Sequence, residues 1–133
     1  RYSRADLVTL NEPELRLATH NRHDSVEALA EKVCKAVNAK HVSITRGTNG
    51  AIMLNRKGNE IQRAPVLSTK VVDRIGAGDA FLSLAGISLA AGLSSELTTF
   101  VASAAAAIDV QIVCNRDPIT PVDLYKYITT LLK

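Results

Sequence analysis

Aromatic residues are scarce in this sequence: they make up 4% of its 133 residues, and tryptophan is absent. Proteins that bind single-stranded nucleic acid use aromatic side chains as stacking surfaces, so the composition argues against such a partner. Long apolar runs are also missing. The most apolar stretch, residues 85–93, is short and contains Gly86, Ser88 and Gly92, whereas a membrane-spanning helix needs about 20 apolar residues. The sequence therefore predicts no nucleic-acid partner and no membrane segment.

Cysteine and clustered charge are scarce as well. The two cysteines, Cys34 and Cys114, have no metal-binding spacing and are predicted to be small core residues of a protein in a reducing compartment. We expect a cytoplasmic protein. The net charge of +3 comes from scattered lysines and arginines, which permits an anionic ligand without requiring one.

The order of predicted elements is that of an α/β protein with a mostly parallel sheet. Strands are predicted at residues 6–10, 41–45, 51–54, 60–63 and 70–72, and helices at about 13–19, 25–37, 77–91, 96–113 and 121–132. The runs 51–54 and 60–63 are predicted to form a hairpin. The length suggests one domain, but the chain starts at Arg1 and almost at once enters a strand-like run, as a piece of a longer protein would.

Helix boundaries follow from capping residues. Asp24, with Glu27 three positions later, is predicted to cap the second helix, and Thr120 before Pro121 is predicted to cap the last one. Residues 77–91 are small and apolar on nearly every side, so we expect that helix to be buried.

One motif points to chemistry. Gly76-Ala77-Gly78-Asp79 lies between a predicted strand and a predicted helix. The N–H groups that open a helix have no intrahelical acceptors and form an anion site, and Asp79 in the first turn could take a proton from an attacking hydroxyl. Asp73, six residues earlier, could bind a substrate hydroxyl. From these features alone, a common loop with an aspartate favoured by the helix dipole explains the motif equally well.

Residues 73–81, Asp-Arg-Ile-Gly-Ala-Gly-Asp-Ala-Phe, resemble the D-T-x-G-A-G-D-x-F motif of the ribokinase (PfkB) carbohydrate kinases. The resemblance implies a three-layer, ribokinase-like Rossmann-type fold and ATP-dependent phosphorylation of a sugar or sugar phosphate. It implies that Asp79 is the general base, that Gly76, Ala77 and Gly78 form the anion hole, and that Asp73 lies near the sugar. The sequence is most similar to the heptose-phosphate kinase branch of the family. The similarity rests on residues 7–11, Leu-Val-Thr-Leu-Asn, and on the Gly76–Asp79 motif followed by an alanine-rich helix.

Three further segments follow in the family's order. Asn11-Glu12-Pro13-Glu14 is similar to the N-x-x-E element, which implies that Asn11 and Glu14 help to organise Mg²⁺, largely through water. Thr45-Arg46-Gly47-Thr48-Asn49-Gly50 is similar to the T-x-G-x-x-G segment that borders ATP, which implies contacts from Thr45, Gly47 and Gly50. Further ATP contacts are implied for Ser103, in the helix beside the adenine, and for Asn115. A first-turn glutamate, a plain turn, a packing serine and an exposed loop remain the alternatives for these segments.

The resemblance also implies a monovalent-cation site. Two departures from the family's sequence pattern leave the presence of that site open. Arg74 replaces the family's usual threonine, and residues 113–118 lack the glycine that the family often carries there. Arg74 could reach a substrate phosphate or disturb that cation site.

We expect residues 1–133 to be the C-terminal, ATP-binding and catalytic part of a kinase domain, without its N-terminal half and lid. As a protein partner, we expect either a second copy of the chain, in a homodimer, or the missing N-terminal half. Two alternatives stay open: a nucleoside or vitamin-type kinase of the same fold, and a non-catalytic nucleotide-binding module or inactive fragment.

Overall fold

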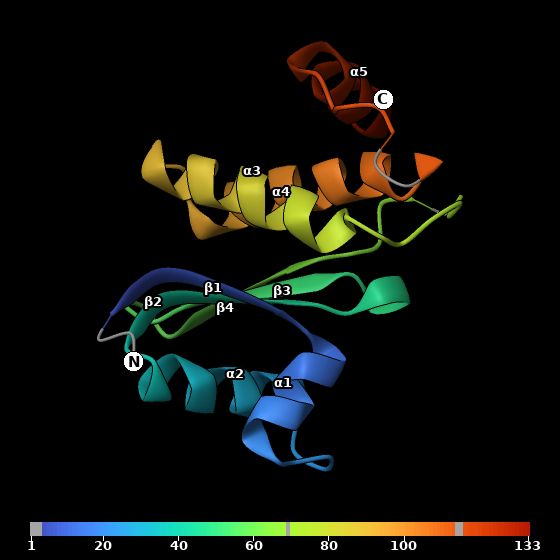
Figure 1. The fold of residues 1–133 in the computed structure, drawn as a ribbon. Helices are drawn as coiled ribbons and strands as arrows, with labels where there is room; N and C mark the ends of the chain where they lie inside the picture. Colours follow the sequence, from blue (N-terminus) through green and yellow to red (C-terminus); the bar gives the residue numbers. More distant parts are fainter. Residues whose placement is uncertain (1–3, 69, 114–115) are drawn as a thin grey trace. The chain divides into compact units, whose positions relative to one another are not determined.

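The computed structural model describes residues 4–68, 70–113 and 116–133. The chain divides into two compact units: unit 1, Arg1–Pro65, and unit 2, Val66–Lys133. In Figure 1 the colours run from blue to green through unit 1 and from green to red through unit 2.

Unit 1 is a four-stranded sheet with two helices. Its elements are β1 (Ala5–Asn11), α1 (Glu12–Thr19), α2 (Val26–Ala36), β2 (Ala39–Thr45), the short 3-10 helix η1 (Gly47–Asn49), β3 (Ala51–Asn55) and β4 (Glu60–Ala64). The strands lie in the order β1-β2-β3-β4. Figure 1 shows α1 and α2 together on one face of this sheet.

The prediction of an α/β fold is confirmed, and the sheet is mixed. β1 and β2 pair in parallel, whereas β2–β3 and β3–β4 pair antiparallel, so the prediction of a mostly parallel sheet holds only for its start. Loop length explains the difference, because a parallel pair needs a crossover of a dozen or more residues, while short loops join antiparallel neighbours. α1 and α2 form such a crossover, and the predicted hairpin is β3–β4.

The core of unit 1 forms where α1 and α2 pack on the sheet. The predicted stripe of α2 is buried through Val26, Leu29, Ala30, Val33 and Cys34. It belongs to one cluster with Leu15 of α1 and apolar residues of the strands. Removing such side chains from water is the main favourable contribution to folding, and it holds α1 and α2 on the sheet.

The helices of unit 2 are α3 (Ala77–Ala90), α4 (Ser95–Asp109) and α5 (Pro121–Leu131). Figure 1 shows α3 and α4 side by side. The four consecutive alanines of α4 permit a close approach to a neighbouring helix, and three of them, Ala104, Ala105 and Ala107, are buried. The prediction that α3 is buried all round is wrong for this chain, because Leu82 and Ile87 are 43% and 66% exposed.

Two predicted elements of unit 2 differ from the structure. Residues 70–72 do not form a strand; instead, the N–H groups of Val72 and Asp73 both donate to the carbonyl of Val110. α4 also ends earlier than predicted, at Asp109 rather than Val113. The N–H groups of Gln111 and Ile112 donate three residues back, to the carbonyls of Ile108 and Asp109, instead of continuing the α-helical pattern.

The predicted caps are confirmed at one helix and corrected at another. Thr120 caps α5 with Pro121 in its first turn. The cap of α2 is Ser25, not Asp24, because α2 begins one residue later than predicted. The Asp24 carboxylate instead binds the side chains of Asn21 and Lys32.

Among the described residues, no helix is long and apolar enough to cross a membrane.

The two glycines of the loop between β2 and β3 should differ in how much an alanine substitution destabilises the fold. At Gly50, φ is +75°, and an added Cβ would lie 2.0 Å from the Ala64 carbonyl oxygen; at Gly47, φ is +56°, and a Cβ would meet nothing within 4 Å. We predict that Gly50→Ala lowers the free energy of unfolding by about 3 kcal/mol or more, and that Gly47→Ala lowers it by about 1 kcal/mol. Urea denaturation of both variants measures the difference, and equal losses would contradict the predicted close approach.

Candidate functional site

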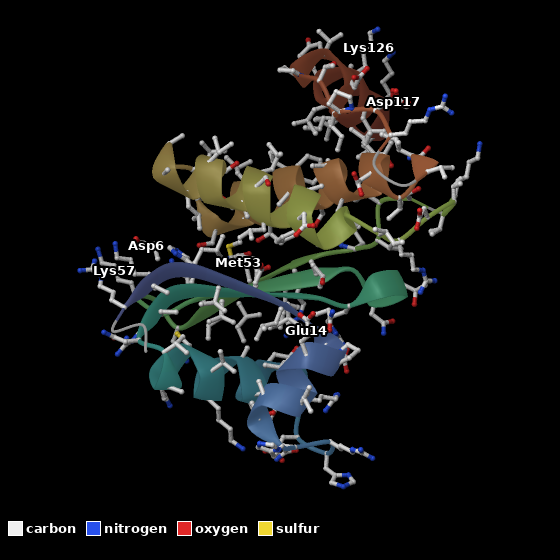
Figure 2. All side chains as sticks on the ribbon, viewed as in Figure 1. Asp6, Glu14, Met53, Lys57, Asp117 and Lys126 are labelled. Carbon is white, nitrogen blue, oxygen red and sulfur yellow. The ribbon has the colours of Figure 1, made fainter. Side chains whose placement is uncertain are left out.

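The carboxyl ends of β1, β2 and β4 and the amino end of β3 lie together at one end of the sheet in unit 1. Asn11 at the end of β1 pairs in register with Thr45 at the end of β2, Thr45 pairs with Ala51, and Ala51 pairs with Ala64. Figure 2 shows Glu14 where β1 runs into α1, while Asp6 lies toward the other end of the strand. Thus the predicted residues Asn11 and Thr45 are neighbours at this edge, as expected for an open α/β sheet.

Asn11 and Glu14 have a structural role that the sequence analysis missed. The Asn11 Oδ1 atom accepts a hydrogen bond from the Glu14 N–H at 2.8 Å, and Glu14 Oε2 accepts one from the Asn11 N–H at 2.9 Å. This is a capping box. The spacing of an asparagine and a glutamate three residues apart was itself the signal, because it is shared by capping boxes and by the N-x-x-E element.

The predicted T-x-G-x-x-G segment forms a tight, internally bonded turn. The Arg46 N–H donates to the Gly50 carbonyl at 2.8 Å, and the Asn49 N–H donates to the Arg46 carbonyl at 3.0 Å. Gly47 and Gly50 both have positive φ. Because Gly50 packs directly against the backbone at Ala64, the turn is held on the end of β4.

The first turn of α3 in unit 2 differs from the starts of the other helices. Asn11, Ser25, Ser94 and Thr120 cap α1, α2, α4 and α5 with their side chains. The N-cap of α3 is Gly76, with φ +96° and no side-chain cap. In the described part of the chain, the N–H groups of Ala77, Gly78 and Asp79 have no acceptor. Such a start is a site for an anion.

The predicted base lies beside this uncapped start. Asp79 is exposed in the first turn of α3. Together with Gly76 and Asp109, it lines a hollow with a volume of about 270 Å³, which residues 117–119 also border. Asp73 precedes the hollow, and its Oδ1 atom accepts a hydrogen bond from the Ile75 N–H at 3.0 Å. The structure thus brings Gly76 and Asp79 together.

Asp109 is a candidate that the sequence analysis missed. It is only 6% exposed. Burial raises its pKa, and the negative charges of Asp73 and Asp79 raise it further. Perturbed titratable groups are common at functional sites. A charged residue near the end of an otherwise apolar helix was the available signal, but it does not reveal that the side chain is buried near Asp79.

The remaining predicted contacts have different outcomes. Ser103 lies in α4, and its buried hydroxyl has no hydrogen-bond partner within the described residues. Its contact with ATP stays a prediction. Asn115 lies outside the described residues. Arg74 is exposed. No group of three or more histidine, cysteine, aspartate or glutamate side chains that could hold a metal is found in residues 4–68, 70–113 and 116–133.

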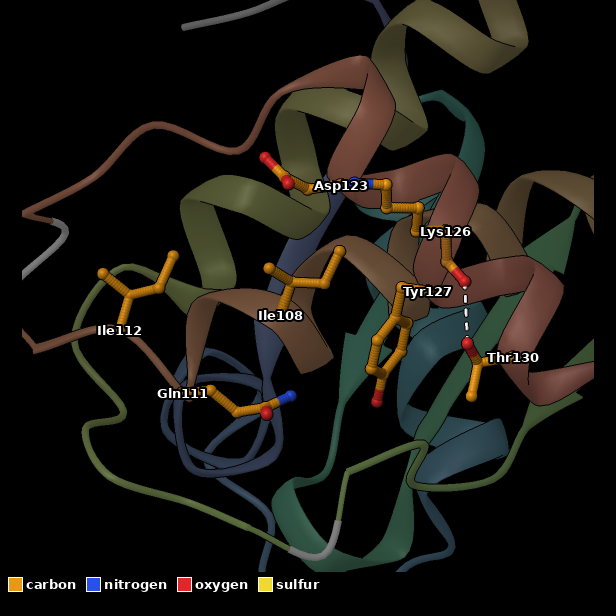
Figure 3. Close-up of a pocket in the computed structure, with 7 residues that line it drawn as sticks. All are labelled: Ile108, Gln111, Ile112, Asp123, Lys126, Tyr127 and Thr130. Carbon is orange, nitrogen blue, oxygen red and sulfur yellow. Dashed lines mark hydrogen bonds between the residues drawn. The ribbon is translucent and has the colours of Figure 1, made fainter.

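A second hollow of unit 2, of about 370 Å³, lies between the end of α4 and α5 (Figure 3). Its lining includes Ile108, Ile112 and Tyr127 and none of the predicted site residues. Its one acidic residue, Asp123, binds Thr120 in the cap of α5. We therefore place the candidate site at the start of α3.

Comparison with solved structures defines the fold as ribokinase-like. The chain is similar to ribokinase from Thermotoga maritima, with a TM-score of 0.82 and 26% identity, over 93% of this chain and 42% of that one. It is also similar in fold to phosphofructokinase-2 from Escherichia coli, with a TM-score of 0.81 and 21% identity, over 96% of this chain and 41% of that one.

Residues 1–119 match the family model described as pfkB family carbohydrate kinase, and the chain belongs to this family. A curated relative, the bifunctional protein HldE of Nitrobacter hamburgensis, is 38% identical over 112 residues, which are 82% of this chain and 23% of that protein. HldE of Bradyrhizobium diazoefficiens is 32% identical over 82% of this chain and 22% of its own length. The chain thus spans about a quarter of these relatives.

The raised pKa of Asp109 gives a prediction with a definite sign. When the pKa of a carboxyl is higher in the folded than in the unfolded state, the protein loses stability as pH rises from the unfolded pKa, near 3.8, through the folded pKa. The Asp109→Asn variant removes this penalty. We therefore predict that it melts at a higher temperature than the wild type at about pH 8 and that this gain disappears at about pH 3.

Thermal unfolding followed by circular dichroism at both pH values measures the effect. Asp117→Asn is the matched control, because Asp117 borders the same hollow but is exposed. A gain for Asp109→Asn that is the same at both pH values would contradict the electrostatic explanation.

Proposed function

We propose that this chain carries the phosphoryl-transfer site of an ATP-dependent kinase whose acceptor is a hydroxyl of a sugar or sugar phosphate. Membership of the pfkB family supports the class of reaction. The site proposed for it is the start of α3, with the anion hole at Gly76, Ala77 and Gly78 and the general base at Asp79.

The observation that carries the proposal is the uncapped start of α3 next to Asp79. The N–H groups of residues 77–79 lack acceptors within the described chain, and the helix dipole makes this end positive. Negative charge that develops on a transferring phosphoryl group would be stabilised there without reorganisation of the protein. An added Cβ at Gly78 would meet nothing within 4 Å, so the space beside these amides is open to a ligand.

The proposed step is an in-line displacement. Asp79 accepts the proton of the acceptor hydroxyl as its oxygen forms a bond to the γ-phosphorus of ATP. The bond between that phosphorus and the bridging oxygen breaks, and ADP leaves with the electron pair. Asp73 is proposed to bind the substrate near this point.

Unit 1 carries its own part of the family pattern. Carboxylate and amide oxygens are suitable for Mg²⁺, which keeps several of its waters. The capping box uses Oε2 of Glu14 and Oδ1 of Asn11, which leaves Glu14 Oε1 for a metal-bound water. On that basis Asn11 and Glu14 fit a water-mediated role, in which Mg²⁺ would neutralise phosphate charge. Thr45, Gly47 and Gly50 are proposed to contact the nucleotide, as are Ser103 and Asn115 of unit 2.

A second candidate function is a non-catalytic nucleotide-binding module. The observation that favours it is the uncapped start of α3, which would hold a phosphate whether or not Asp79 acts as a base. Tight nucleotide binding without phosphoryl transfer to any acceptor would support this candidate over the first.

The direct test measures ATP turnover by the complete protein against a panel of sugars, sugar phosphates, nucleosides and hydroxymethyl compounds. Heptose phosphate comes first in the panel, because the sequence resembles that branch. We predict that Asp79→Asn lowers kcat by about 10²- to 10⁴-fold, since a positioned base contributes that much. Glu96→Gln, at an exposed first-turn acid of α4, is the control. Undiminished turnover in Asp79→Asn would refute the assignment of the base.

Substitution of Gly78 should change the stability of the fold and the affinity for ATP in opposite directions. It lies in the first turn of α3, where alanine is the better helix former, so Gly78→Ala should stabilise the fold by about 0.5 kcal/mol. The added methyl group would project into the open space beside the amides and obstruct a phosphate. We therefore predict a variant that is more stable but binds ATP at least about tenfold more weakly.

Denaturation and nucleotide titration of the same preparation measure both effects. Gly86→Ala is the matched control, because Gly86 also lies in α3 and an added Cβ there would meet nothing within 4 Å. Unchanged ATP affinity in Gly78→Ala would count against the anion hole.

A further inference from the structure

Two residues of opposite charge follow the paired ends of β1 and β2. Asn11 and Thr45 are register partners, so the next residues along the two strands, Glu12 and Arg46, leave the sheet beside each other. The Arg46 Nε atom donates to Glu12 Oε2 at 3.2 Å. This ion pair joins the N-x-x-E element to the T-x-G-x-x-G segment across the edge of the sheet.

Glu12 is held in place by a second arginine. Its Oε1 atom accepts hydrogen bonds from Nη2 of Arg16 at 2.8 Å and from Nε of Arg16 at 3.1 Å. The remaining Arg16 nitrogen, Nη1, donates to the backbone carbonyls of Arg22 and Asp24. Glu12 is therefore fixed to α1 and, through Arg16, to the loop before α2, so it can act as a rigid anchor for Arg46.

This arrangement differs from an ordinary surface ion pair. The side chains of Glu12, Arg16 and Arg46 are only 25–27% exposed, and both oxygens of the Glu12 carboxylate are used. The hydrogen bond from Arg16 is the main factor that lowers the pKa of Glu12, with a further contribution from Arg46. Charge-assisted bonds of this kind are stronger and more geometrically specific than exposed pairs.

The backbone of Arg46 is part of the turn that its side chain anchors. Its N–H donates to the Gly50 carbonyl, and its carbonyl accepts from the Asn49 N–H. Movement of the Arg46 side chain would therefore displace the turn that contains Gly47 and Gly50. A direct role for Glu12 in chemistry has no geometric support, because its oxygens are already bonded to arginines.

We propose that Glu12 is a positioning residue that holds the turn at residues 46–50, through Arg46, in the conformation that contacts the nucleotide. The inference rests on the proposed function for the nucleotide itself. A turn fixed before binding saves the entropy of ordering it on binding. Loss of the anchor should therefore weaken ATP binding.

The test compares Glu12→Gln with Asp6→Asn, which removes an exposed ion pair between the same two strands. Asp6 pairs with Lys40 at 2.6 Å at the amino ends of the same two strands. We expect Glu12→Gln to bind ATP about three- to tenfold more weakly and Asp6→Asn to bind it normally. Hydrogen exchange of the Arg46, Asn49 and Gly50 amides should accelerate in Glu12→Gln, with no change in the buried amides of α2.

A second pair of variants guards against simple loss of folding. Arg46→Gln should reproduce the Glu12→Gln effects, and Arg46→Lys, which keeps the charge, should restore part of the ATP affinity. Normal ATP binding and normal turn exchange in Glu12→Gln would overturn the inference, as would accelerated exchange spread evenly over unit 1.

Failure of the proposed function can be distinguished from failure of the proposed role of Glu12. If the wild-type chain bound no ATP, the proposed function and the nucleotide part of this inference would both be overturned. The exchange measurement would still decide whether Glu12 holds the turn.

Discussion

The proposed site depends on one feature of the fold, the shortage of hydrogen-bond acceptors at the start of α3. Four of the five α-helices in the described chain begin with a side chain that accepts from the first turn. α3 begins with a glycine in a left-handed conformation, and its first amides are left for another acceptor. Gly78 and Asp79 are exposed, so these amides are open to water or to a ligand oxygen. The carboxylate of Asp79 lies in the same turn, where it could accept a proton, and α3 has no side-chain cap.

Three aspartates near the start of α3 determine the charge of the site. Asp109 is buried near Asp73 and Asp79, and its raised pKa reflects both burial and their negative charges. A site with several carboxylates and a positive helix end favours a cationic or proton-donating group next to a bound anion. A sugar hydroxyl next to a phosphate has this character. Acceptor identity is a separate matter, since the chain spans only part of the length of its relatives.

Local patterns predicted most of the elements. The apolar stripe of α2, the Thr120–Pro121 start of α5 and the β3–β4 hairpin depend on residues close in sequence, and all three are confirmed. The failures involve distant partners. Residues 70–72 were predicted to form a strand, but the N–H groups of Val72 and Asp73 donate to the Val110 carbonyl after α4. At the site, Gly76 and Asp79, which the motif singled out, line the same hollow, and their roles stay a prediction. The burial of Asp109 and the Glu12–Arg46 ion pair could not be predicted, because they depend on register and packing.

The most direct test of the central claim is amide chemical-shift perturbation in the ¹⁵N-labelled chain on addition of ATP and Mg²⁺. The account predicts the largest shifts at Ala77, Gly78 and Asp79, whose N–H groups would acquire phosphate acceptors. If these amides did not shift while those lining the hollow between α4 and α5 did, the phosphoryl-transfer site would not be at the start of α3.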